Sequence, residues 1–306
     1  MLLVHGGAWD IPDEECEAHL AGLEKVLQIG KKGLLGGKHA LDVVVEVVSA
    51  MESDGAFDAG VGAVLNRDGF VELDAGVMDG KTHHFGSVAG IQHYENPIQI
   101  ARDIINKGRR QFCFLSGEGA ESFAEKAGFP RVENDQLICE RERRRHEQLL
   151  AQAAYHTSHP FLAGDDVHPR GTVGCVALDR SGGLAAATST GGTPFRPAGR
   201  IGDSPLPGSG FFANKDAAAS ATGWGEAIAS MSLCYEGVRS VSHASAESAA
   251  ADVIESMGET IQNEDGQPAT GGIILLSKRG EAGFAFSTPR MARGGWYEGG
   301  ELWFTV

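Results

Sequence analysis

The stretch "HPRGTVGCVAL", residues 168–178, joins a long polar segment to an apolar run that predicts a β-strand. The run begins at Thr172, directly after Gly171, a residue type that accepts backbone conformations closed to residues with a side chain. If the bond between Gly171 and Thr172 is cut, Thr172 carries a hydroxyl and a free α-amino group, and such an amine titrates at roughly 7.7–8.0. One residue then supplies both a nucleophile and its general base. From "GTVG" alone, an ordinary strand that happens to begin with threonine is the more common arrangement.

The residues that follow favour the catalytic interpretation. The segment "TSTGGTPFRPAGRIGDSPLPGSGFFA", residues 188–213, predicts Thr190 at the end of the neighbouring strand, where its hydroxyl would lie beside that of Thr172. Arg200 and Asp203 are three residues apart in a loop rich in glycine and proline, so both can face one small cavity. An arginine fork binds a carboxylate and an aspartate accepts from an ammonium group, so the pair would hold the head group of an α-amino acid.

A third group of residues lies further along the chain. The segment "SATGWGEAI", residues 220–228, predicts Thr222 and Gly223 at the start of a helix. A hydroxyl and backbone N–H groups at such a position would stabilise an oxyanion. Taken singly, these features are equally typical of a surface ion pair, a turn and a helix cap. Their order after Thr172 is what points to catalysis.

The composition is that of a globular protein without affinity for polyanions. The chain has 306 residues, of which 42% are apolar and 22% are charged. Its 26 Lys and Arg stand against 41 Asp and Glu, a net charge of −15, which argues against nucleic acid and anionic membranes as partners. Five scattered cysteines without a CxxC pair predict free thiols rather than a zinc cluster or disulfides. The start "MLLVHGG" lacks the features of a signal peptide, so we expect a cytoplasmic protein.

The apolar pattern predicts a single α+β domain over residues 1–306. The segment 39–54 is rich in valine, yet its length and the spacing of its large apolar residues favour a buried helix over a strand. A mobile linker is expected at about 145–171, where polar residues, glycine and proline accumulate. Strands are expected at 2–7, 70–78, 84–92, 112–115, 172–179, 184–190, 272–278 and 283–287, and helices at 13–33, 39–54, 97–106, 118–127, 224–238 and 245–262.

The whole chain resembles the plant-type L-asparaginases, or isoaspartyl peptidases, which are N-terminal-nucleophile threonine hydrolases. The pair "TSTGG" and "GRIGDSP" at this distance is the most specific part of the resemblance. The motifs that carry it are "VHGGAW" at 4–9, "FDAGVGAVLN" at 57–66, "ELDAGVMDG" at 72–80, "GTVG" at 171–174, "TSTGG" at 188–192, "GRIGDSP" at 199–205 and "ATGWGE" at 221–226.

The resemblance implies a four-layer αββα sandwich, made as a precursor that cleaves itself between Gly171 and Thr172. Residues 1–171 would form an α piece that ends in the linker, and residues 172–306 a β piece that begins at the nucleophile. It also implies a homodimer of such cleaved pairs. No cofactor is expected beyond a structural sodium ion, which backbone carbonyls around residues 51–61 would hold.

The resemblance also assigns roles by motif position. Thr172 is the nucleophile, and Thr190 is the second threonine that hydrogen-bonds it. Arg200 and Asp203 hold the α-carboxylate and the α-amino group of the substrate. The last pair, Thr222 and Gly223, provides the oxyanion hole.

Two departures from the family pattern bear on these roles. Asp58 stands where the family usually has asparagine, and a carboxylate near the reaction centre would repel an oxyanion unless it is protonated or turned away. The segment between "GSG" at 208–210 and "ATG" at 221–223 is one residue shorter than the resemblance leads us to expect.

The implied activity is hydrolysis of L-asparagine to aspartate and ammonia, and of β-aspartyl dipeptides, through a β-aspartyl ester on Thr172. Two alternatives stay open on the sequence. Small residues around "TPFRPAG" leave room for the bulkier leaving group of a glycosylasparaginase. A homologue that keeps the amino-acid clamp but never cleaves itself would be a binding protein rather than an enzyme.

Overall fold

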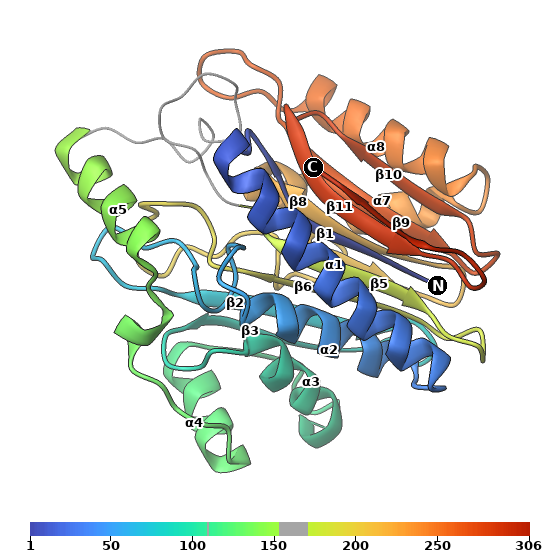
Figure 1. Cartoon of the computed structure of the whole chain (residues 1–306), viewed down its shortest axis with the longest axis horizontal. Helices are drawn as coiled ribbons and strands as arrows, with labels where there is room; N and C mark the ends of the chain where they lie inside the picture. The colour runs from blue at the N-terminus through green and yellow to red at the C-terminus, as the bar shows by residue number, and fades with distance from the viewer. Residues whose placement is uncertain (109, 153–170) are drawn as a thin grey trace.

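The computed structural model describes residues 1–108, 110–152 and 171–306, and within these parts it contains two β-sheets covered by helices (Figure 1). The larger sheet has the strand order β12-β11-β1-β5-β6-β2-β3-β4, and the smaller has the order β10-β9-β8-β7. The prediction of an α+β protein is therefore confirmed. The strands are β1 (Leu2–Trp9), β2 (Leu73–Asp79), β3 (His84–Ile91), β4 (Phe114–Ser116), β5 (Val173–Leu178), β6 (Leu184–Thr190), β7 (Phe211–Ala213), β8 (Ala217–Gly223), β9 (Gly271–Ser277), β10 (Ala282–Phe286), β11 (Arg290–Trp296) and β12 (Leu302–Thr305).

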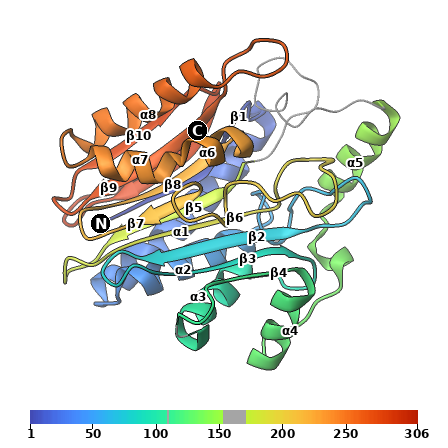
Figure 2. The ribbon, with the colours of Figure 1, turned by 180° about the vertical axis from the view of Figure 1, so that it is seen from behind.

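Helices pack against the outer face of each sheet. Helices α1, α2 and α3 pack against the larger sheet, and α7 and α8 pack against the smaller one (Figures 1 and 2). Strands β8 and β9 of the smaller sheet contact β1, β5 and β6 of the larger sheet. The helices are α1 (Asp13–Leu35), α2 (Ala40–Glu52), α3 (Pro97–Gly108), α4 (Gly117–Ala127), α5 (Glu140–Gln152), α6 (Gly225–Met231), α7 (Leu233–Ser240) and α8 (Ala246–Thr260), with a 3₁₀ turn η1 at Asn134–Leu137.

Strand periodicity divides the apolar side chains among three cores. Successive strand residues point to opposite faces of a sheet. On β1, Leu2 and Val4 join the core beneath α1 and α2, whereas Leu3 joins the core between the sheets. On β9, Ile273 joins the core beneath α7 and α8, whereas Ile274 again lies between the sheets. Both sheets are therefore buried on both faces at their centres.

The valine-rich segment around 39–54 forms helix α2, as its spacing predicts. Its buried residues recur at Val43, Val44, Val47 and Val48, which is one face of a helix rather than alternate positions of a strand. Burial of this face against β5 and β6 outweighs the weak helix propensity of valine.

Four strands were not expected from the sequence, namely β7, β8, β11 and β12. Strand β8 is "AAASATG" and β11 is "RMARGGW", and neither has the β-branched or aromatic content by which strands are found. The helix expected at 224–238 is two helices, because Ser232 adopts a positive φ of 48° between α6 and α7. Helix α5 extends to Gln152, into the range expected for the linker, and residues 153–170 lie outside the described parts.

Helix length also bears on membranes. No helix in the described parts of the chain is both long enough and apolar enough to cross a bilayer.

Candidate active site

The pairing of β5 with β6 brings Thr172 and Thr190 together. The antiparallel register sets Val173 opposite Ser189, so the next residues outward, Thr172 and Thr190, face each other. The Thr172 hydroxyl donates to the Thr190 hydroxyl over 3.1 Å. Thr190 Oγ1 also accepts from the N–H of Gly192 at 2.9 Å, which fixes its orientation. Thr172 is 8% exposed, so its hydroxyl lies in a nearly dry site.

The backbone before Thr172 lies tightly against the "HGG" segment of β1. A Cβ added to Gly171 would lie 2.1 Å from the Cα of Gly7, and a Cβ on Gly7 would lie 2.5 Å from the Cα of Gly171. Gly7 also has a φ of +105°, which favours glycine. The two backbones can pack this closely only because neither residue has a side chain.

A buried chain of hydrogen bonds holds the other side of Thr172. The Nδ1 of His5 lies 3.0 Å from the carbonyl oxygen of Thr172, and its Nε2 lies 2.8 Å from the hydroxyl of Ser220. Burial lowers the pKa of His5 to about 3, so the ring is neutral and carries one N–H. That proton belongs on Nδ1, because a carbonyl can only accept.

The same proton count gives the direction of the hydrogen bond between His5 and Ser220. With His5 donating through Nδ1, its Nε2 accepts from the Ser220 hydroxyl. The Ser220 hydroxyl oxygen also lies 2.6 Å from that of Thr188, and the Thr188 hydroxyl donates to the carbonyl oxygen of Gly210 at 2.9 Å. A Cβ on Gly174 would lie 2.0 Å from the Ser220 hydroxyl oxygen, so Gly174 leaves the space in which this chain runs.

The two residues expected to bind an α-amino acid line the same small cavity as the two threonines. Its lining includes Thr172, Thr190, Arg200, Asp203 and Gly223. The cavity measures about 10 Å³, which is room for roughly one water molecule. At this volume the cavity is too small for an amino-acid substrate.

The Arg200 side chain is held by a residue that the sequence reasoning did not single out. Glu226 accepts from Arg200 Nε at 2.8 Å and from Nη2 at 2.7 Å, a bidentate pair. A Cβ on Gly225 would lie 2.9 Å from both Arg200 Nη2 and Asp203 Oδ1, so both side chains surround this glycine. The only sequence signal for Glu226 was its place in "ATGWGE".

The carboxyl group of Asp203 is buried and only partly compensated by its neighbours. Burial raises its pKa to about 7, and the nearby Arg200 opposes that rise only in part. Its Oδ2 is buried and has no hydrogen-bond partner among the described residues. The hydroxyl of Thr193, which also lines the cavity, is likewise buried without such a partner. A threonine in a glycine- and proline-rich loop carries no sequence signal, so Thr193 was missed.

Thr222 and Gly223 lie at the end of strand β8 rather than at the start of a helix, which corrects that expectation. Helix α6 begins two residues later, at Gly225. Gly223 lines the cavity, but Thr222 is fully buried behind it and its Oγ1 accepts from the N–H of Ala8 at 3.4 Å. Gly223 has a φ of +136° and lies against the Gly271 backbone, so a side chain there would be strained.

The Asp58 carboxylate lies beside the site but holds backbone groups. It is fully buried, and its Oδ1 accepts from the N–H of Val64 at 3.0 Å. Its own carbonyl accepts from the N–H of Gly191 at 3.1 Å. Asp58 thus ties the loop before β2 to the residue that directly follows Thr190.

Known proteins are similar to this chain over nearly its full length. A model of the family described as asparaginase matches residues 1–304. The plant-type L-asparaginase of Pyrobaculum calidifontis is 38% identical over 304 residues, 98% of this chain and 98% of its own length. The isoaspartyl peptidase of Salmonella typhimurium is 37% identical over 311 residues, 98% of this chain and 96% of its own. The isoaspartyl peptidase/L-asparaginase of Homo sapiens is 37% identical over 283 residues, 92% and 88% of the two chains.

The contact between Gly7 and Gly171 generates a first prediction. Gly7→Ala should slow cleavage of the Gly171–Thr172 bond by roughly 10- to 100-fold, because the added Cβ displaces the Gly171 carbonyl from the Thr172 hydroxyl. Denaturing gels of the purified protein over time would measure the cut fraction. Gly37→Ala is the matched control, since Gly37 also has a positive φ but no atom within 4 Å of an added Cβ. Cleavage of Gly7→Ala at the unmodified rate would contradict this account.

Proposed function

Because this chain belongs to the asparaginase family, we propose that it hydrolyses the side-chain amide of L-asparagine and the isopeptide bond of β-aspartyl dipeptides. The observation that carries the proposal is one cavity lined by Thr172, Thr190, Arg200 and Asp203. Two hydroxyls 3.1 Å apart stand beside one guanidinium and one carboxylate. A substrate with a carboxylate, an ammonium group and an amide matches these groups.

The proposal includes maturation by self-cleavage. The Thr172 hydroxyl would attack the carbonyl carbon of Gly171, and the peptide bond would give way to an ester. Water would then hydrolyse this ester, which leaves a carboxylate on Gly171 and a free amine on Thr172. The close packing of Gly171 on Gly7, directly before Thr172, supports a cut at this bond.

Hydrolysis would follow with Thr172 in both chemical roles. Its amine removes the hydroxyl proton while the oxygen attacks the side-chain carbonyl, and the amine then protonates the leaving ammonia or amino acid. The same amine activates the water that releases aspartate. Gly223 would stabilise the oxyanion from the cavity wall. The resemblance assigns the same role to Thr222, the fully buried residue before it.

The finer points of fold and assembly belong to the proposal. The packing of helices on the outer faces of two facing sheets supports an αββα sandwich of the N-terminal-nucleophile type. The α piece at 1–171 and the β piece at 172–306 follow from the proposed cut. The homodimer of cleaved pairs and the cytoplasmic location stay predictions from the sequence.

Intact mass and activity test this function directly. The unmodified protein should give two fragments, the second beginning at Thr172, and should hydrolyse L-asparagine and β-aspartyl-leucine. Thr172→Ala should stay as one chain without either activity, because it lacks the attacking hydroxyl. N-acetylglucosaminyl-asparagine serves as the third substrate. Preference for it would favour a glycosylasparaginase, and an uncut chain that hydrolyses asparagine would sink the mechanism.

The state of Asp203 predicts a pH dependence of amino-acid binding. Since burial raises the pKa of Asp203 to about 7, the carboxylate is ionised above that pH and neutral below it. Affinity of the cleaved enzyme for L-aspartate should therefore fall about tenfold from pH 8 to pH 6, as the carboxylate that holds the ammonium is protonated. Calorimetry at both pH values measures it. Asp203→Asn should bind weakly at both, and equal affinity of the unmodified enzyme would refute the assignment.

We also propose that the loop at 51–61 binds a sodium ion through backbone carbonyls. The proposal follows the resemblance to the family. In this structure the carbonyl oxygen of Glu52 accepts from the N–H of Val61 at 2.7 Å and that of Gly55 accepts from the Arg141 guanidinium at 3.2 Å, so an ion would have to share or replace these donors. Backbone oxygens are suitable ligands for a hard cation. No group of three acidic, histidine or cysteine side chains that could hold a metal exists among the described residues, so the ligands would come from the backbone.

Removal of sodium should lower thermal stability. At sodium about 100-fold above its Kd, binding stabilises the folded state by about 2.7 kcal/mol. Replacing sodium with choline at equal ionic strength should therefore lower the melting temperature. Gly60→Ala should melt at the same temperature in both salts, because its added Cβ would lie 2.3 Å from the Glu52 carbonyl oxygen and block the ion. An unmodified protein whose melting temperature does not change when choline replaces sodium would contradict the sodium site.

A further inference from the structure

The loop that carries Arg200 and Asp203 runs from the end of β6 to the start of β7 without regular structure. We propose that Arg196 is the positioning residue that holds this loop in its substrate-binding shape, with Glu72 as its partner. The proposal rests on the function proposed above, because it concerns the grip on the same substrate. Neither residue lines the cavity with the threonines.

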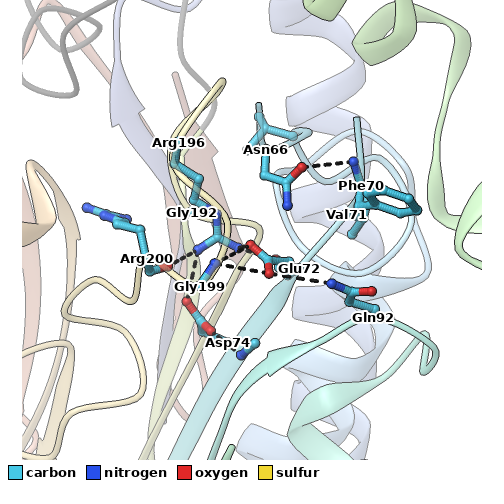
Figure 3. Close-up of polar contacts among 12 residues, drawn as sticks. Asn66, Phe70, Val71, Glu72, Asp74, Gln92, Gly192, Arg196, Gly199 and Arg200 are labelled. Atoms are coloured by element: carbon cyan, nitrogen blue, oxygen red, sulfur yellow. Dashed lines mark hydrogen bonds and ion pairs between the residues drawn. The ribbon is translucent and has the colours of Figure 1, made fainter. Parts of the chain in front are cut away.

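The guanidinium of Arg196 ties the loop to strand β2 (Figure 3). Its Nη1 donates to the carbonyl oxygen of Arg200 at 2.6 Å, and its Nη2 donates to the carbonyl oxygen of Glu72 at 2.6 Å. Nη1 also lies 3.4 Å from the carboxylate of Asp74. The rigid fork thus reaches the loop and β2 at once, which one ammonium at the end of a lysine chain cannot reproduce.

The carboxylate of Glu72 holds the backbone N–H of Gly199, the residue before Arg200. Both of its carboxylate oxygens accept from the N–H of Gly199, at 3.1 and 3.2 Å. Arg196 and Glu72 therefore fix the backbone before and after the Arg200 Cα, at the N–H of Gly199 and at the carbonyl of Arg200. These contacts set the position from which the Arg200 side chain reaches Glu226 and the cavity.

The first residues of the loop are held by the same arginine. A Cβ on Gly192 would lie 2.6 Å from Arg196 Nη1, so the guanidinium lies directly against the Gly192 backbone. Gly192 has a φ of +88°, and its N–H donates to Thr190. One side chain thus contacts the loop beside Thr190 and again at Arg200, where the clamp begins.

Burial makes these contacts difficult to replace. Arg196 is 1% exposed, and the side chains of Asp74 and Glu72 are 0% and 7% exposed. A buried cation requires both its charge partners and its hydrogen-bond acceptors. By contrast, Thr172 is held by Thr190 and His5, neither of which Arg196 contacts through its side chain. Arg196 reaches Thr190 only indirectly, through the Gly192 backbone, so its loss should impair substrate binding more than it displaces the nucleophile.

The experiment compares Arg196→Lys with the unmodified protein. We expect self-cleavage at the unmodified rate, a kcat for L-asparagine within a few-fold, and a KM raised roughly 10- to 100-fold because Arg200 is misplaced. Calorimetry with L-aspartate on the cleaved protein should show the same loss of affinity. Arg67→Gln is the matched control, since exposed Arg67 donates to the carbonyl of Phe195 in the same loop from outside, and it should leave KM unchanged.

Glu72 provides a second pair of variants if Arg196→Lys does not fold. Glu72→Ala should raise KM, and Glu72→Gln, which keeps an acceptor for the Gly199 N–H, should restore most of the affinity. Slower self-cleavage of Arg196→Lys, or an equal fall in kcat with KM unchanged, would overturn the proposal. So would equal KM values for Glu72→Ala and Glu72→Gln. An unmodified protein that neither cuts itself nor hydrolyses asparagine would instead refute the proposed function.

Discussion

The antiparallel register of β5 on β6 is the constraint on which the rest of the site depends. It sets Thr172 opposite Thr190 at the strand ends and brings their hydroxyls within 3.1 Å. A slip of one residue would turn every side chain of β5 to the other face of the sheet. Both faces are packed, with Val173 and Cys175 beneath the helices and Val176 between the sheets, so the cores enforce the register that the chemistry needs.

Around this pair, small residues decide how closely the backbones pack. Gly171 lies on Gly7, and Gly174 leaves room for the contact between His5 and Ser220. The carbonyl of Thr172 is thereby held by a neutral, fully buried histidine, while its hydroxyl faces the cavity. The two glycines of "GTVG" thus have different effects on Thr172. Gly171 allows the close approach of Gly7, and Gly174 leaves space for the contact between His5 and Ser220.

The charged residues fall into a buried group that holds the loop and a group that lines the cavity. Arg196 is buried with Glu72 and Asp74, so its positive charge is paired with carboxylates inside the protein. Arg200 lies nearer the surface, paired with the half-exposed Glu226, and Asp203 retains a carboxylate oxygen without a hydrogen-bond partner in the described structure. An arginine thus lines the cavity of a chain whose net charge is −15, so the overall charge says little about this site.

The sequence by itself determined the α+β class, the helix at α2, and the group Thr172, Thr190, Arg200 and Asp203, because periodicity and motif spacing are local properties of a chain. It misplaced Thr222 and Gly223. It missed β8 and β11, because strands rich in alanine or glycine are defined by their partners, and it missed β7 and β12, which have only three and four residues. Only the tertiary structure decided that Glu226 grips Arg200, that Asp58 holds Val64, and that Arg196 pins the loop. Those contacts join residues from 4 to 124 positions apart through burial and shape, for which no local pattern exists.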